Sequence, residues 1–165
     1  MSLSPASLAQ YVFWAEATPA AKLDRLAFYR TREPWTGSES AFVIATAGPF
    51  WWMGLASSRN ILAQRQSMCP YGMDPVLCFA DPGPVELRRF MCRLFEQHVY
   101  RGQFYDRNEE THRVIERLRT HPAPLHCPGV PELPPRLLSF VPRNFAQERK
   151  LRAEAIGWYR SGAHS

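Results

Sequence analysis

The sequence has no run of about 20 apolar residues, the length that a membrane-spanning helix needs. Its start, MSLSPASLAQYVFW, has no basic residue before the apolar part, so we do not expect a secretion signal. No dense disulfide-type pattern links the four cysteines, which are Cys69, Cys78, Cys92 and Cys127. We therefore expect a cytoplasmic protein that does not bind a membrane, with reduced thiols that are mostly buried.

Motifs that mark common enzyme sites are missing as well. The sequence holds no CxxC or HExxH motif and no glycine-rich phosphate loop. The segment HPAPLHC places His121, His126 and Cys127 within seven residues, and imidazole and thiolate suit zinc. Because the spacing matches no standard pattern, a proline-rich loop is the favoured interpretation and we predict no metal ligand. A small metal- or thiol-dependent enzyme stays open as a third hypothesis.

Two other candidate catalytic groups have simpler explanations. Cys92 lies six residues before His98 on a predicted helix, about 600° of rotation, so the two side chains occupy different faces. Glu109 and Glu110 follow Asp106 in the first turn of another helix, where the helix dipole favours acidic groups. We therefore predict no catalytic residue in this chain.

Lysine is nearly absent, since 18 of the 20 basic residues are arginine. Residues 1–83 balance six basic against six acidic side chains, and residues 84–165 carry fourteen against nine, which is the whole net charge of +5. Such an excess favours phosphate or carboxylate partners. Glutamates are interleaved with the arginines, so a solvated helix face is the favoured interpretation and nucleic-acid binding is an alternative. The arginines lie in two series: Arg88, Arg89, Arg93 and Arg101, then Arg107, Arg113, Arg117 and Arg119.

Fifteen prolines divide the chain into short elements. Periodicity and capping residues predict helices at residues 5–17, 19–32, 50–66, 85–100, from Asp106, and 145–159. Residues 41–46 are a strand or the start of a helix, residues 75–80 are extended, and RLLSFV, residues 136–141, is the best strand candidate. We predict one domain, 1–165, of the mainly α (α+β) class, with five or six helices and a small antiparallel sheet near the C-terminal third. It is helical over 1–119, and a proline-rich loop, a short strand and a helix follow over 120–165.

Aromatic residues are plentiful, with five Trp, six Tyr and ten Phe. Trp, Tyr and Arg dominate the energetics of protein interfaces, so this composition favours a protein with a partner surface. In the pair Trp51-Trp52 we expect one ring in the core and the other facing a partner. The partner-interface candidates are Arg30, Trp51, Trp52 and Tyr105.

The segment DRLAFYRTR, residues 24–32, resembles a helical motif, Arg-Leu-Ala-x-Tyr-Arg, of the partner proteins encoded beside one family of multinuclear iron enzymes. That family includes the methanobactin biosynthesis pair. The resemblance implies a non-catalytic subunit that forms a heterodimer with an iron-dependent oxidase and binds a ribosomally made precursor peptide, whose cysteines the oxidase modifies. It implies no cofactor in this chain and iron in the partner. The match covers nine residues, and TREPWTGSES departs from the relatives.

If residues 136–141 form an exposed edge strand, unpaired backbone groups there can accept an extended peptide. Leu138 and Phe140 then point to one face, and Arg136 and Arg143 at the ends can hold acidic side chains. These four residues are the peptide-binding candidates. A strand buried between helices is the alternative.

Overall fold

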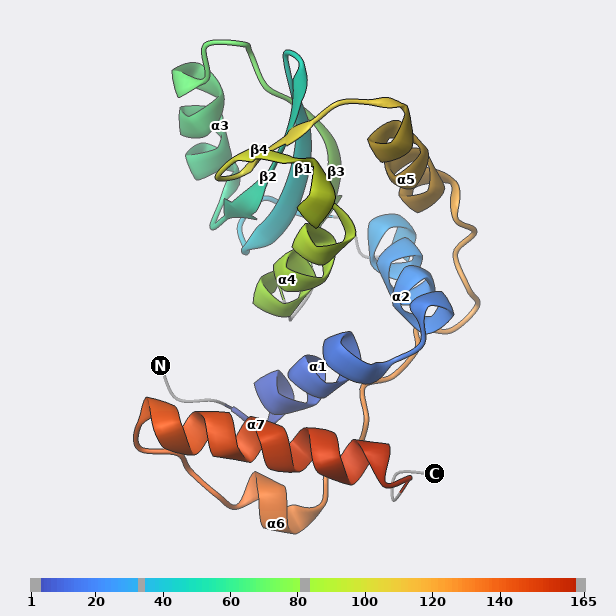
Figure 1. The fold of residues 1–165 in the computed structure, drawn as a ribbon, viewed down its shortest axis with the longest axis vertical. Helices are drawn as coiled ribbons and strands as arrows, with labels where there is room; N and C mark the ends of the chain where they lie inside the picture. The colour runs from blue at the N-terminus through green and yellow to red at the C-terminus, as the bar shows by residue number, and fades with distance from the viewer. Residues whose placement is uncertain (1–3, 33–34, 81–83, 163–165) are drawn as a thin grey trace. The chain divides into compact units, whose positions relative to one another are not determined.

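The computed structural model describes residues 4–32, 35–80 and 84–162 and divides the chain into two compact units (Figure 1). Unit 1 combines two segments that are distant in sequence, Met1–Lys22 and Pro128–Ser165. Unit 2 is the continuous segment Leu23–Cys127. No helix among the described residues combines the length and the apolar character that crossing a membrane requires.

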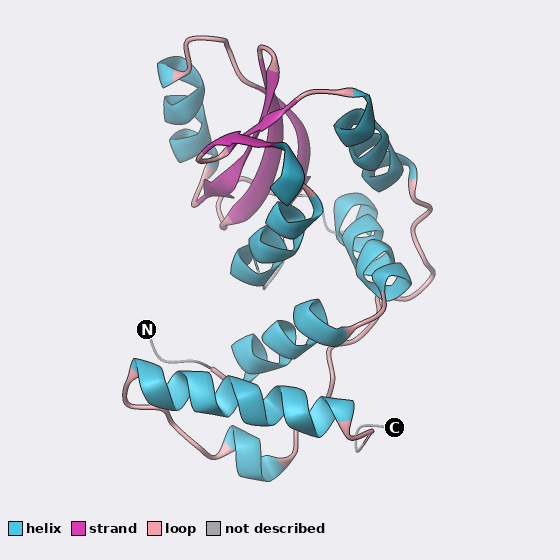
Figure 2. Cartoon of the chain, in the orientation of Figure 1, coloured by secondary structure: helices cyan, strands magenta, loops and turns pink. Residues whose placement is uncertain are grey.

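Unit 2 is built on a five-stranded antiparallel sheet with the strand order β3-β1-β2-β5-β4 (Figure 2). Its helices are α3, α4, α5, most of α2 and the short 3-10 helix η1. The strands are β1 (Ala41–Ala47), β2 (Phe50–Ala56), β3 (Asp74–Phe79), β4 (Val99–Arg101) and β5 (Phe104–Asp106). The helices are α2 (Pro19–Arg32), α3 (Arg59–Met68), α4 (Pro84–Leu94), η1 (Glu96–His98) and α5 (Glu109–Thr120).

A two-residue turn, Gly48-Pro49, joins the central strands β1 and β2. Gly48 has φ +59°, and Pro49 fixes its own φ near −65°, which together fit a type II′ turn. Tyr71 covers this turn so closely that a Cβ on Gly48 would lie 2.9 Å from the tyrosine ring. The turn thus sets the register Ala47↔Phe50 and every pairing beyond it.

The two faces of the sheet are packed differently. Alternation along the strands places Trp51 and Tyr105 on one face and Trp52 and Phe104 on the other. The first face packs against α4, which contacts β1 and β2, and against α5. The second face packs against α3, through Leu62, and its apolar cluster includes Val43, Ala45, Trp52 and Met73.

Unit 1 is a small helical assembly in which α1 (Pro5–Glu16), α6 (Pro135–Leu138) and α7 (Phe145–Arg160) share one core (Figure 1). Ser4 and Asn144 cap α1 and α7 by accepting hydrogen bonds from the backbone of Ser7 and Gln147. Arg160 binds Glu16 at 2.7 Å and joins the ends of the two long helices. The core residues are Leu8, Ala9, Val12, Leu133, Leu137, Leu151 and Ala155.

The α+β class is confirmed, but the expected position of the sheet is wrong. The sheet lies at residues 41–106, in the part that was expected to be helical, and not near the C-terminal third. The predicted helix at 50–66 is strand β2 followed by α3, because the Gly48-Pro49 turn folds β2 back on β1. The predicted start at Asp106 is also wrong, since Asn108 caps α5 in a capping box with Thr111.

The strand predicted at 136–141 does not exist. Pro135 occupies the first turn of the one-turn helix α6, and Leu137 is buried in the core of unit 1. Residues 139–141 have no regular structure, so the edge-strand basis for peptide binding is removed. The helices predicted at 5–17, 19–32 and 145–159 are confirmed within one residue at each end.

Candidate functional site

The segment DRLAFYR on α2 makes contacts inside unit 2. Asp24 binds the Nε2 atom of His121 at 2.7 Å, and Arg25 donates to the hydroxyl of Tyr29 at 3.2 Å. Arg30 donates to the backbone carbonyls of Leu118 and, at 3.0 Å, His121, so it caps the C-terminal end of α5. The residues that carry the resemblance therefore hold α2 to the end of α5.

Trp51 lies in the core and is 3% exposed. Its indole Nε1 donates to the hydroxyl of Thr111 at 3.1 Å. The guanidinium carbon of Arg107 lies 5.0 Å from the centroid of the ring. The ring of His112 approaches edge-on, with a centroid distance of 5.0 Å. Because its only polar atom is satisfied within unit 2, Trp51 has the features of a structural residue.

Trp52 lines a solvent-accessible hollow of about 440 Å³ between the sheet and α3. Phe104, its direct partner across the strands β2 and β5, lies beside it on the sheet side. We call this cavity the α3 hollow, and the residues that line it are Trp52, Ile61, Gln64, Arg65, Met68, Cys69, Pro70, Met73 and Phe104. Arg65 lies over the indole of Trp52 at 5.7 Å, within the range of a cation–π contact.

A group of aromatic rings continues from Phe104 along the same surface. The ring of Phe50 meets the rings of Phe104 and Tyr71 edge to face, with centroid distances of 6.1 Å and 5.8 Å. It stacks on the ring of Tyr100, with a centroid distance of 4.5 Å and an interplanar angle of 24°. Tyr71 and Tyr100 are 56% and 63% exposed. We call Phe50, Tyr71 and Tyr100 the aromatic rim. Exposed stacked rings of this kind are common in binding surfaces.

The segment that includes the α3 hollow's helix contains positively charged side chains and no negatively charged ones. No Asp or Glu occurs from residue 40 to residue 73, a segment that includes two arginines, Arg59 and Arg65. The strand register places Asp74 and Asp106 at the hairpin end of the sheet, opposite Thr46 and Phe50. The surface along α3 therefore favours an anionic ligand.

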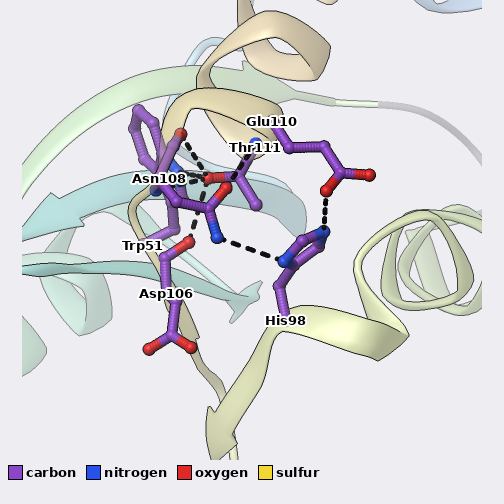
Figure 3. A network of polar contacts seen from close by, with 6 residues as sticks. All are labelled: Trp51, His98, Asp106, Asn108, Glu110 and Thr111. Carbon is purple, nitrogen blue, oxygen red and sulfur yellow. Dashed lines mark hydrogen bonds and ion pairs between the residues drawn. The ribbon is translucent and has the colours of Figure 1, made fainter.

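His98 is held in a polar network at the start of α5 (Figure 3). The side-chain oxygen of Asn108 accepts from the backbone of Thr111, which orients the amide so that its nitrogen donates to Nδ1 of His98 at 3.2 Å. Nε2 of His98 then carries the proton and faces the carboxylate of Glu110 at 3.3 Å. Both ring nitrogens are engaged, so this histidine links η1 to α5 and has the features of a structural group.

Tyr105, a partner-interface candidate, is also buried, and burial together with its contact to Cys92 raises the pKa of its hydroxyl. Burial likewise raises the pKa of the Cys78 thiol. Neither group has the lowered pKa of an activated nucleophile. Among the described residues, no three His, Cys, Asp or Glu side chains come together as a metal site would need.

The peptide-binding candidates lie on unit 1. Leu138 and Phe140 are 39% and 45% exposed, and Val141 and Phe145 beside them in sequence are more exposed. Arg136 and Arg143 are exposed on either side of this segment. Phe140 also lines a small cavity of about 110 Å³ with Gln147, Lys150, Leu151 and Glu154 of α7.

Comparison of the chain with protein-family models, curated proteins and solved structures found no significant match.

Sequence reasoning named Trp52 but missed the residues that surround it. Arg65 falls inside the helix predicted at 50–66, and none of Arg65, Met68, Cys69 and Phe104 is among the candidate site residues. The acid-free segment from 40 to 73 was the available indication, because an exposed helix without acidic residues is unusual in a chain with 15 of them.

Proposed function

We propose that unit 2 binds nucleic acid through the surface formed by the α3 hollow and the aromatic rim. The observation that carries this proposal is the cation–π contact of Arg65 with Trp52 in a segment without acidic residues, beside exposed aromatic rings. Proteins that bind single strands combine cationic side chains, which contact phosphates, with aromatic rings, on which bases stack. Both elements are adjacent here.

The two arginine series, which lie mainly on α4 and α5, with Arg101 on β4 and Arg107 before α5, give weaker support for such a surface. Arg113 is paired with Glu109 and Arg119 with Glu116, so part of their charge is already neutralised. Arg107 donates to the carbonyl of Gly48. By contrast, α3 contains Arg59 and Arg65 and no acidic residue.

Fluorescence anisotropy with a labelled oligonucleotide tests the proposal. We expect binding at about 50 mM salt that weakens steeply as salt rises, because phosphate contacts release counterions. Arg65→Gln lowers the slope of log K against log salt by about 1. Arg117→Gln, an equal charge change at an exposed position on α5, is the control and leaves the slope within error of the wild type. Absence of binding at about 50 mM salt contradicts the proposal.

As a second candidate function, we propose that the chain is the partner subunit of an iron-dependent oxidase and binds its precursor peptide, as the resemblance implies. The support is the exposed apolar segment with Leu138 and Phe140, which Arg136 and Arg143 flank. An apolar peptide with acidic flanks is complementary to this segment. Since the segment is not a strand, side-chain contacts and not strand addition provide the affinity.

Co-expression with a candidate oxidase and a cysteine-containing peptide, followed by pull-down, tests this second function. We expect Phe140→Asp to release the peptide, because it places a carboxylate in the apolar contact. Ser161→Asp, at an exposed position after α7, is the charge-matched control. A chain that captures neither oxidase nor peptide contradicts the hypothesis.

A further inference from the structure

Resting on the proposed nucleic-acid binding, we infer that the α3 hollow receives one unstacked base of a single strand. Its volume of about 440 Å³ lies within the range of small-ligand pockets, about 300–1,000 Å³. Of the cross-strand pair on the sheet side, the half-buried Phe104 offers aromatic surface, and Trp52, which is 4% exposed, forms the floor beside it. The thioethers of Met68 and Met73 give polarizable surface around it, which suits a flat π-system.

The polar groups of the hollow match a nucleotide. Arg65 is the one charged group among the lining residues, all of which the structure describes, and it is a donor suited to a phosphate. Gln64 offers both an amide donor and a carbonyl acceptor, the combination that pairs with a base edge. An apolar pocket with one cation and one amide is thus complementary to a base and its phosphate.

The aromatic rim extends this site beyond one nucleotide. Phe50 contacts Phe104 of the hollow on one side and stacks on the exposed Tyr100 on the other. Successive rings provide stacking surfaces for successive bases of an extended strand. In a duplex the faces of the bases are already stacked on one another, so the site selects single strands or extruded nucleotides.

Gly54 keeps the sheet side of the hollow in place. A Cβ at this position would lie 2.6 Å from Cζ2 of the Trp52 indole and 2.8 Å from Cη2. The indole therefore extends along β2 over Gly54. Without this glycine, the ring has to move and the pocket changes shape.

The test uses the full chain and oligonucleotides that contain 2-aminopurine, whose fluorescence falls when the base stacks. We expect quenching and tighter binding for the single strand than for the matched duplex. Met68→Glu, at a residue that is 82% exposed and lines the hollow, places a carboxylate at its mouth and weakens single-strand binding about tenfold more than its control does. That control is Ser67→Glu, an equal charge change one residue earlier on α3, outside the lining residues.

Alkylation of cysteines provides an independent readout. Cys69 lines the hollow and Cys92 does not, and both are half-buried. A bound single strand slows the alkylation of Cys69 and leaves Cys92 unchanged. If oligonucleotides bind but Met68→Glu equals Ser67→Glu, with no quenching and no Cys69 protection, the base pocket is refuted and the proposed function stands. If no oligonucleotide binds at low salt, the base pocket and the proposed nucleic-acid binding are both contradicted.

Discussion

Trp51 and Trp52 are neighbours in sequence and both are almost fully buried, yet they serve opposite faces of one sheet. Trp51 is enclosed by α5, and its ring nitrogen is bonded to Thr111. Trp52 lines the α3 hollow, where its partner is an exposed arginine. Burial alone does not separate the two roles. The two tryptophans differ in their surroundings: the partners of Trp51 form their hydrogen bonds within the fold, whereas the arginine beside Trp52 is accessible to a ligand.

The largest effect is expected on the closed face. Trp51→Ala removes a large buried ring and one of the two hydrogen bonds that the Thr111 hydroxyl accepts, so the free energy of unfolding falls by about 3–5 kcal/mol. Urea denaturation measures it. Trp35→Ala, at a half-buried indole, is the comparison and costs less. Equal losses for the two variants contradict the description of this face as the closed one.

Gly54→Ala tests the open face. We expect a loss of about 1–3 kcal/mol in the free energy of unfolding, because the added methyl group overlaps the Trp52 indole. In a Trp52→Leu background the overlap with the indole is absent and the nearest remaining atom is the amide nitrogen of the flexible Gln103 side chain, 2.9 Å from the new Cβ, so Gly54→Ala then costs little. A double-mutant cycle in urea therefore gives a coupling energy; a coupling near zero rules out the proposed overlap.

Asn108→Ala removes the cap of α5, which supports the closed face. The expected loss is about 0.5–2 kcal/mol, since the backbone of Thr111 loses its acceptor and His98 loses its donor. Asn108→Asp retains a capping oxygen and loses the donor to His98, and its added charge is favourable at the helix N-terminus, so any remaining loss of stability reports the His98 contact. Thermal unfolding compares the variants, and an Asp variant as unstable as the Ala variant means that the His98 contact dominates.

Tyr105→Phe has the smallest effect, and that effect depends on pH. Because the pKa of Tyr105 is raised in the folded state, the unfolded chain releases this proton at lower pH than the folded protein does. Stability therefore falls as pH rises above about 10, the ordinary tyrosine range. The variant shows a shallower fall of Tm as the pH rises above about 10, and Tyr100→Phe at an exposed ring follows the wild type.

The helices predicted correctly are those whose ends are encoded locally. Ser4 and Asn144 act as caps, and Pro5 and Pro19 begin their helices, so neighbouring residues suffice to place them. The helix predicted at 50–66 was wrong because a short apolar run is compatible with either a strand or a helix. Its state depends on pairing with β1 and β5, and the Gly48-Pro49 turn was the local indication that was overlooked.

The candidate site was less predictable than the fold. Trp52 and Phe104 lie 52 positions apart and meet only because β5 pairs with β2, a contact that one sequence does not reveal. Arg65 and Met68 reach the same hollow because α3 follows β2 directly. Residue type alone favoured Arg30 as an interface group, but in the structure Arg30 binds backbone carbonyls at the end of α5.

The division of the chain into two units affects the order in which they fold during synthesis. Unit 2 is complete once Cys127 has left the ribosome, so its sheet can form while the rest of the chain is still being made. The apolar residues Leu8 and Val12 of α1 can pack into their core only after Leu151 and Ala155 of α7 have been synthesised. Until α7 has been synthesised, Leu8 and Val12 therefore lack the α7 residues that cover them in the folded unit 1.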